Sequence, residues 1–443
     1  MTKIQFINHA SVKIYGKDCC LLSDPWYQGD AFNKGWNLLI ELTDEEIYNL
    51  LEDVTHIWVS HEHPDHFSIG FFKKFLPTLI ENNTSFLFQE TKDKRVLNFV
   101  KKSGLNCVEL PFLESVEVGD DFSVTCFKDG FYDSALLVST EGKKILNLND
   151  CSIRSESRAL EIKNITGECD VLLTQFSYAA WKGGRNNVEW RLDAAKEKLD
   201  TLKLQVDVFN PKYLIPFASY IYFSNKENMY LNEGVNTPHH VVDCLNENET
   251  HVAVMKPFDI LSDFSAPNNN HESLKFWESR YVENENNPKH LYATIDLQTL
   301  DEAFDIYKTR VFDNNSEMMM KLLRVFSPFK VFKPVFIYLE DLDKTVSIDI
   351  FKEKLQTVDV DAHLVMSSES LNFLFNNTFG FDTLTVNACF EEGKKGGFSS
   401  ATRTLAIENL NNMGISFKMK FLFNLNIIFL FLNRLRKVSK KIA

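Results

Sequence analysis

Several classes of protein are excluded by residues that this sequence lacks or spaces in the wrong way. None of its eight cysteines stands in a C-x-x-C or C-x-H motif, so no zinc ribbon, thioredoxin motif or iron–sulfur cluster is readable. Basic residues are in deficit, since 48 Lys and Arg stand against 61 Asp and Glu and the net charge is −13. Nucleic-acid binding needs a basic face that displaces counterions, so we expect no nucleic-acid partner.

What remains is the composition of an ordinary globular protein, with 44% hydrophobic and 25% charged residues. One hydrophobic core supports roughly 250–300 residues, and this chain has 443, so we expect more than one domain. The sequence starts Met1-Thr2-Lys3-Ile4 without a signal-peptide pattern, and a chain of this size needs no disulfides. These features predict a cytoplasmic protein.

The first half of the chain alternates short apolar runs with helical segments. This alternation predicts a layered α/β sandwich, in which strands end in polar loops and helices lie between them. The predicted strands are Lys3–Ile7, Ser11–Tyr15, Cys20–Ser23, Thr55–Ser60, Ser85–Gln89, Val116–Cys126, Ala135–Thr140, Lys144–Asn149 and Tyr213–Pro216. The predicted helices are Phe71–Glu81 and Val188–Val206.

A domain boundary is indicated near residue 262. The segments Ser265–Ser273 and Glu283–Pro288 are polar and rich in turn residues, as linkers are. We therefore expect a first α/β domain at residues 1–262 and a smaller α+β domain at residues 263–443. Strands are expected in the second domain at Val335–Leu339, Thr345–Ile350 and Thr383–Phe390.

The C-terminal segment is basic and apolar. No Asp or Glu follows Asn409, whereas seven Lys and Arg do. Phe421–Leu432 is an apolar run that is too short to span a bilayer. Two interpretations stay open: residues 418–443 lie on an anionic membrane surface as a peripheral contact, or a last helix packs its apolar face on the domain.

The sequence Ser60-His61-Glu62-His63-Pro64-Asp65-His66 follows the predicted buried strand directly. Imidazole and carboxylate are ligands that zinc, iron and manganese share. The spacing lets one loop serve two ions, with His61 and His63 on one and Asp65 and His66 on the other. The motif therefore predicts one or two divalent metal ions, with zinc expected first and iron or manganese as alternatives. A solvated polar turn is the competing interpretation.

The H-x-H-x-D-H spacing resembles that of the metallo-β-lactamase fold, an αββα sandwich with a metal site along one sheet edge. Shorter blocks between about residues 4 and 290 resemble the metal-binding catalytic domain of the CMP-N-acetylneuraminate hydroxylase family. They are Asn8-His9-Ala10, Ser23-Asp24-Pro25-Trp26, Ala31–Leu39, Ile145–Cys151, Phe176–Ala180 and Pro216–Tyr220. The resemblance implies a metallo-β-lactamase-like, metal-binding domain at residues 1–262.

The resemblance also implies roles for single residues. Asp150 matches a carboxylate that bridges two metals, although taken alone it also fits a simple turn. Asp24 would orient a metal-bound imidazole from behind, and an ordinary Asp-Pro turn is its alternative. His9 stands at a strand end and is either structural or placed at the metal site. The implied metal ligands are His61, His63, Asp65, His66 and Asp150, of which Asp65 and His66 are also expected to be catalytic.

Two histidines that the family supplies are missing from this chain. One normally precedes the bridging carboxylate, and here Asp129 or Asp133 would have to take its place. The other normally follows the Pro-Phe-Ala block, where this chain reads Tyr222–Lys226. His239 and His240 come later and would compensate if their loop folds back, or else they cap a helix. With these departures, the site holds one metal or binds two weakly.

A glycine pair between two cations follows the Phe176–Ala180 block. The sequence Trp181-Lys182-Gly183-Gly184-Arg185 would let backbone and cations meet a phosphate or carboxylate, and a plain surface loop is the alternative. The predicted substrate-binding residues are Tyr178, Trp181, Lys182 and Arg185.

The leading hypothesis is a metal-dependent hydrolase. A bound metal would lower the pKa of its water toward about 7 and so supply hydroxide at neutral pH. The resemblance implies a sugar nucleotide or another anionic sugar derivative as substrate. The hydroxylase family also carries a Rieske domain with C-x-H and C-x-x-H motifs, which this sequence lacks, and this favours hydrolysis. Two alternatives remain: a diiron oxygenase with a separate electron donor, and a catalytically degenerate binding protein.

Overall fold

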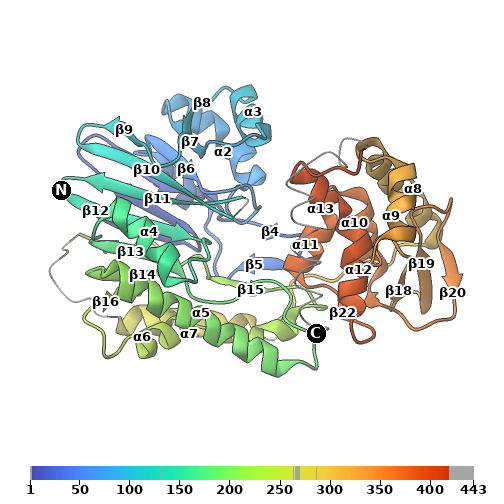
Figure 1. Cartoon of the computed structure of the whole chain (residues 1–443). Coiled ribbons are helices and arrows are strands. Elements are labelled where there is room, and N and C mark those ends of the chain that lie inside the picture. The colour runs from blue at the N-terminus through green and yellow to red at the C-terminus, as the bar shows by residue number, and fades with distance from the viewer. Residues whose placement is uncertain (1, 131, 263, 265–269, 286, 419–443) are drawn as a thin grey trace. The chain divides into compact units, whose positions relative to one another are not determined.

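Two seven-stranded sheets pack face to face in the computed structural model, which describes residues 2–130, 132–262, 264, 270–285 and 287–418 (Figure 1). The first sheet has the order β17 (Ile260–Leu261), β1 (Lys3–Asn8), β2 (Ser11–Tyr15), β3 (Cys20–Ser23), β6 (His56–Val59), β7 (Ser85–Gln89) and β8 (Asn106–Leu110). The second has the order β16 (His251–Val252), β14 (Tyr213–Phe217), β13 (Val171–Gln175), β12 (Lys143–Asn149), β11 (Asp133–Thr140), β10 (Phe122–Asp129) and β9 (Ser115–Gly119). Apolar side chains of both sheets share one core, in which the rings of Phe6 and Phe217 lie 6.3 Å apart.

Helices cover the outer face of each sheet. Three pack on the first sheet, where the rings of Phe72 and Phe86 lie 5.5 Å apart. Others pack on the second sheet, and this order of layers confirms the predicted αββα metallo-β-lactamase sandwich. The helices are α1 (Asp44–Leu51), α2 (Ile69–Glu81), α3 (Arg95–Lys102), α4 (Glu156–Thr166), α5 (Val188–Phe209), η1 (Met229–Gly234), α6 (Pro238–Cys244) and α7 (His271–Asn284). A small sheet is formed by β15 (Ile221–Phe223), β5 (Trp36–Leu38) and β4 (Asp30–Ala31).

The parallel strands at the centre of each sheet position the site. In the first sheet β6 runs parallel to β3 and β7, and in the second β12, β13 and β14 run parallel to one another. The carboxyl ends of parallel strands meet at one edge of a sheet, which is where α/β proteins bind their ligands. The loops that follow β3, β6 and β12 carry Asp24, His61 and Asp150 to this edge.

The second unit of the chain comprises residues 183–186 and the described residues from 291 onward. It confirms the predicted smaller α+β part. Its sheet has the order β20 (Gln356–Val358), β19 (Lys344–Ile348), β18 (Val335–Leu339), β21 (Leu364–Met366) and β22 (Glu391–Glu392). Its helices are α8 (Leu297–Asn314), α9 (Glu317–Phe326), α10 (Ser368–Asn376), α11 (Gly380–Asn387), α12 (Gly397–Leu405) and α13 (Ile407–Asn412).

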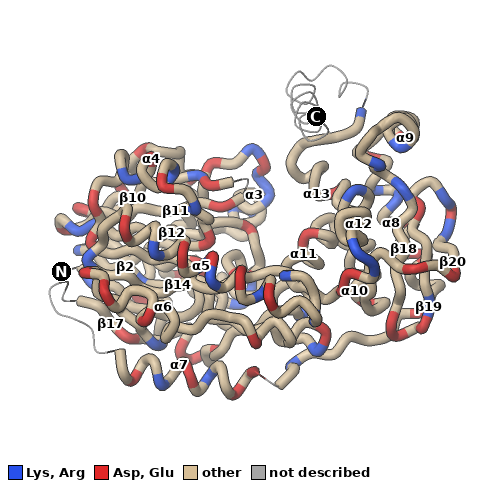
Figure 2. The backbone as a smooth tube through the Cα atoms, turned by 60° about the horizontal axis from the view of Figure 1, so that its bottom comes forward, with Lys and Arg blue, Asp and Glu red and all other residues tan. Residues whose placement is uncertain are grey.

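The first unit extends beyond the predicted boundary between residues 262 and 263. It includes residues up to His290, because helix α7 buries Trp277 in the core of the sandwich. Acidic and basic residues are interspersed along the elements of both units (Figure 2). None of the described helices has the length and apolarity needed to cross a membrane. The predicted membrane-surface segment 418–443 lies outside the described residues except for residue 418.

Two strand predictions are wrong. Val116–Cys126 is not one strand, because a turn at Asp121, with φ of +53°, separates β9 from β10 and pairs them as a hairpin. Thr383–Phe390 lies largely in helix α11. Its β-branched residues favour a strand locally, but Phe381 and Leu384 are spaced for a helix and are both buried. Packing therefore overrides local preference at this position.

Candidate metal centre

The histidine motif forms the loop between β6 and α2, and Asp24 holds this loop in place. The backbone N–H of Ser60 donates to Asp24 Oδ1 at 2.8 Å, and the Ser60 hydroxyl donates to Asp24 Oδ2 at 2.9 Å. Asp24 itself is 1% exposed and follows the end of β3. Because β3 and β6 are neighbours in the sheet, a residue 36 positions earlier in the chain fixes the start of the motif.

His66 lies at the centre of the cluster and is completely buried. Its Nδ1 lies 3.1 Å from Asp24 Oδ2. Its Nε2 lies 3.3 Å from Asp65 Oδ2 and 3.2 Å from Asp150 Oδ2. Burial disfavours the charged imidazole, but the carboxylates of Asp65, Asp150 and Asp24 outweigh it and raise the pKa of His66 well above its usual value.

The pKa values of the carboxylates beside His66 shift in the opposite direction, to below their usual range. Burial opposes their ionisation, but the neighbouring His66 holds the pKa of Asp65 well below its usual range and lowers the pKa of Asp150 to about 2. Two ionised carboxylates, those of Asp65 and Asp150, therefore lie against one imidazolium. This excess of negative charge matches what a divalent cation would neutralise.

His61 and His63 form the second part of the cluster. His61 Nε2 lies 2.9 Å from His63 Nδ1, and His61 Nδ1 lies 3.0 Å from the Ser60 hydroxyl. Burial, aided by the nearby His66, lowers the pKa of His61 to about 4. The ring is therefore neutral at pH 7, and a neutral ring nitrogen is what a metal ion requires.

Asp133 faces this pair from the start of β11. Its Oδ1 lies 3.8 Å from His61 Nε2. Burial and the charge of Asp150 raise the pKa of Asp133 to about 6. Asp129 is its cross-strand partner in β10. Of the two acidic residues expected to replace the first missing histidine, Asp133 is the one beside His61.

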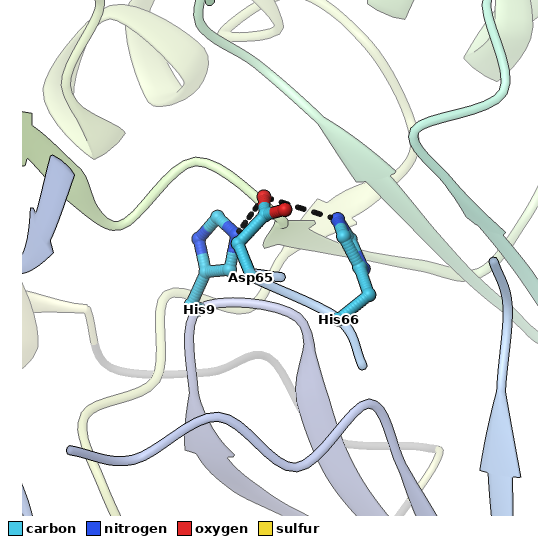
Figure 3. Close-up of side chains that lie close together, drawn as sticks. All are labelled: His9, Asp65 and His66. Atoms are coloured by element: carbon cyan, nitrogen blue, oxygen red, sulfur yellow. Dashed lines mark ion pairs between the residues drawn. The ribbon is translucent and has the colours of Figure 1, made fainter. Parts of the chain in front are cut away.

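His9 lies on the other side of Asp65, at the tight bend between β1 and β2 (Figure 3). Its Nε2 is 3.4 Å from Asp65 Oδ2, and its ring packs edge-on against Trp26. Among the described residues, His9 Nδ1 and Asp65 Oδ1 have no hydrogen-bond partner, whereas His9 Nε2 and His66 Nε2 have only their ion-pair contacts with carboxylates. Buried polar atoms without partners are costly. All four are atoms of metal-ligating types.

Two groups of potential ligand atoms can be drawn from the cluster, and the atoms within each lie within 4.8 Å of one another. One group is His9, Asp65 and His66, and the other is His61, His66 and Asp150. Together with the unpartnered atoms His9 Nδ1 and Asp65 Oδ1, these groups show that the residues present fit a divalent metal. A small cavity of about 20 Å³ adjoins them, lined in part by His9, Asp65, Asp150, Gln175 and Tyr178.

The predicted substrate residues do not all reach this cavity. Tyr178 lines it, but its hydroxyl donates to the backbone carbonyl of Leu231. Trp181 is buried with its ring 5.4 Å from that of Trp190. Arg185 belongs to the second unit, where its backbone N–H donates to Glu391 at 3.1 Å. Lys182 is half-buried and is not among the residues that line the cavity.

His239 and His240 do not replace the second missing histidine. Both are exposed in the first turn of helix α6. The Nδ1 of His240 accepts from the backbone N–H of Thr237 at 2.9 Å, and His239 lies 3.9 Å from Glu278. The bond from Thr237 confirms helix capping for His240, whereas His239 makes no capping bond among the described residues.

Sequence reasoning missed two residues behind Asp150. Gln175 Nε2 donates to the Asp150 carbonyl at 2.6 Å, and Gln175 Oε1 accepts from Lys198 Nζ at 2.7 Å. Gln175 ends β13, the neighbour of the strand that precedes Asp150, so its place at a strand end could have indicated it. Lys198 lies within a helix rich in charged residues, where its spacing gives no signal.

The sequence is similar to curated hydroxylases over half of its length. It is 28% identical over 251 residues to the cytidine monophosphate-N-acetylneuraminic acid hydroxylase of Danio rerio, and 28% identical over 247 residues to that of Xenopus laevis. Each alignment covers 52% of this chain and 40% of the relative, so the chain matches less than half the length of these proteins. No family model matches the sequence.

Solved structures of the same fold are more distant. The diiron β-hydroxylase CmlA from Streptomyces venezuelae has a TM-score of 0.44 at 14% identity, covering 59% of this chain and 54% of its own. The metallo-β-lactamase fold protein YhfI from Bacillus subtilis has a TM-score of 0.38 at 11% identity, covering 59% of this chain and all of its own.

Proposed function

We propose that the first unit is a metal-dependent enzyme that holds two divalent ions and hydrolyses an anionic sugar derivative. The observation that supports this most strongly is the buried cluster of imidazole nitrogens and carboxylate oxygens, in which His9 Nδ1 and Asp65 Oδ1 have no hydrogen-bond partner among the described residues. Buried polar atoms are rarely left without a partner, and a bound metal would supply one for these two.

The proposed ligands divide between two positions. His61, His63 and Asp133 hold one ion, with Asp133 in the place of the first missing histidine. Asp65 and His66 would hold the other together with His9, whose Nε2 lies 3.4 Å from Asp65 Oδ2. Asp150 lies close to His66 and is proposed to bridge the two positions. Zinc, iron and manganese all accept this mixture of nitrogen and oxygen ligands.

A bound divalent ion supplies two things in such a site: it acidifies a water molecule and it polarises an oxygen of the substrate. The chain's own residues orient the reaction. Asp24 accepts from His66 Nδ1 and thereby keeps Nε2 unprotonated when a metal is present. The side chains of Asp133 and Asp150 are 31% and 28% exposed, so they form the face of the cluster that substrate and water can reach.

A second candidate is an oxygenase with a separate electron donor. The similarity to curated hydroxylases favours it, since these relatives carry that activity in their names. The proposed ligand set also suits two iron ions, because iron accepts imidazole and carboxylate ligands as readily as zinc does. The same substrate class is proposed for both candidates, on the grounds that the relatives are named for a cytidine monophosphate sugar.

Isotope labelling separates the two candidates. The metal-loaded protein is incubated with cytidine monophosphate-N-acetylneuraminic acid in H₂¹⁸O, and in parallel with ¹⁸O₂ and a reductant, and products are analysed by mass spectrometry. Cleavage with label from water supports the hydrolase. Label from oxygen gas moves the oxygenase to first place. If a panel of phosphodiester, ester and amide sugar derivatives gives no product under either condition, the protein is not an enzyme of either kind.

A further inference from the structure

Three cations, Arg154, Lys182 and Lys198, interact electrostatically with one another close to Asp150. Arg154 follows β12, and Lys182 follows β13. Lys198 belongs to helix α5, and its Nζ donates to Gln175 Oε1 at 2.7 Å. Gln175 in turn donates to the carbonyl of Asp150 at 2.6 Å. Two hydrogen bonds therefore connect Lys198 to a proposed metal-bridging residue.

The positive charge of this group is only partly neutralised. Arg154 Nη1 pairs with Glu197 Oε1 at 2.7 Å. Lys182 and Lys198 make no ion pair with any carboxylate in the part of the chain that the structure describes. Both lysines are half-buried, whereas most lysines lie at the surface. Glu197 is thus the one carboxylate of the described residues that forms an ion pair with a member of this group.

The pKa values of the two lysines support their proximity. Burial, with the charge of Arg154, lowers the pKa of Lys182 below its usual value. Burial lowers the pKa of Lys198 to about 8, and the charges of Arg154 and Lys182 add to this while Asp150 opposes it. The cluster thus keeps charged groups where water solvates them poorly. A bound anion would relieve this cost and form charge-assisted hydrogen bonds.

We propose that Arg154, Lys182 and Lys198 form a subsite for an oxyanion of the substrate, a phosphate or a carboxylate, beside the metal centre. The inference rests on the proposed function, because that proposal brings an anionic substrate to the metal ligands. Gln175 positions the subsite, since its amide bonds to Lys198 on one side and to Asp150 on the other. The bond to be cleaved would then lie between the anchored oxyanion and the metals.

Isothermal titration calorimetry with inorganic phosphate tests the subsite. The full chain is titrated in its metal-loaded form and again after chelation, so that binding to the metals is separated from binding to the lysines. Lys198→Met and Lys182→Met are expected to raise the Kd for phosphate about ten-fold or more in both forms, since each removes a charged hydrogen-bond donor. Lys196→Met is the matched control, because Lys196 is exposed on the same helix, and its Kd is expected to equal that of the wild type.

One further variant and one further ligand complete the titration experiment. Arg154→Gln changes an exposed side chain. It replaces a lysine variant in the titration if circular dichroism shows that the lysine variant does not fold. Acetate in place of phosphate shows which oxyanion the subsite prefers. An unchanged Kd in all three variants, or phosphate binding that vanishes on chelation, overturns the proposal. Lysine-dependent phosphate binding in a protein that retains no metal after loading would leave the subsite standing and contradict the proposed function instead.

Discussion

Asp24 offers a sharp test of how the site is organised, because one buried carboxylate accepts from several groups at once. It accepts from the N–H and hydroxyl of Ser60, faces His66 Nδ1 at 3.1 Å, and accepts from the side-chain amide of Asn149. Asp24→Ala leaves at least three buried donors without this acceptor. At about 1–3 kcal/mol for each unsatisfied group, the free energy of unfolding falls by about 3 kcal/mol or more.

Asp24→Asn separates metal binding from folding. Asparagine keeps one oxygen for the Ser60 N–H but turns an N–H group toward His66 Nδ1. The imidazole then carries its proton on Nε2, the nitrogen that faces Asp65 and Asp150. Loss of such an orienting partner lowers metal affinity about 10–100-fold. Stability falls less than in Asp24→Ala, because the cavity stays filled.

Two measurements check this prediction. Competition with a fluorescent zinc chelator gives the metal Kd, and urea unfolding of the metal-free protein gives the free energy. Asp120→Asn is the control, since Asp120 is an exposed carboxylate paired with Lys17. If Asp24→Asn binds zinc as tightly as the wild type does, the assigned orientation of His66 is refuted.

Three further predictions concern a ligand, a core residue and a buried charge. His9→Ala is expected to reduce the metal content from two ions per chain to one while circular dichroism stays unchanged; retention of both ions would exclude His9 as a ligand. Trp277→Ala should destabilise the sandwich by about 3–5 kcal/mol in urea unfolding, because the side chain is fully buried, and an unaffected midpoint would place residues 271–284 outside the first unit. The pKa of Lys198 is about 8 in the folded chain against an ordinary 10.5, so the folded state binds fewer protons across that window. Unfolding free energy should therefore rise between pH 8 and 10.5, by up to ~3 kcal/mol more in the wild type than in Lys198→Met, and equal slopes would show that the ammonium is not desolvated.

The sequence predicts those parts of the fold and of the candidate site that depend on local patterns. The strands that lead into the histidine motif are short apolar runs bounded by polar loops, and they form where this pattern places them. The H-x-H-x-D-H spacing alone brings His61 and His66 together. Asp24 and Asp150 required the family resemblance, because nothing local distinguishes a carboxylate at a sheet edge from one in a turn.

The remaining features depend on contacts between residues that are distant in the chain. His9 meets Asp65 only because β1, β3 and β6 lie in one sheet, so its own neighbours in the sequence cannot reveal that contact. The choice of Asp133 over Asp129 depends on the register of the β10–β11 hairpin. Helix α7 joins the sandwich through Trp277, although the polar segment before it is typical of a linker.

The metal content of the purified protein tests the central claim most directly. The chain is purified without added metal, loaded separately with zinc, manganese and ferrous iron, desalted, and measured by inductively coupled plasma mass spectrometry beside His61→Ala and His66→Ala. We predict two tightly held ions per chain in the wild type with at least one of these metals, and loss of one or both in each variant. A wild-type protein that retains no more metal than the variants, with every metal tried, would contradict the account.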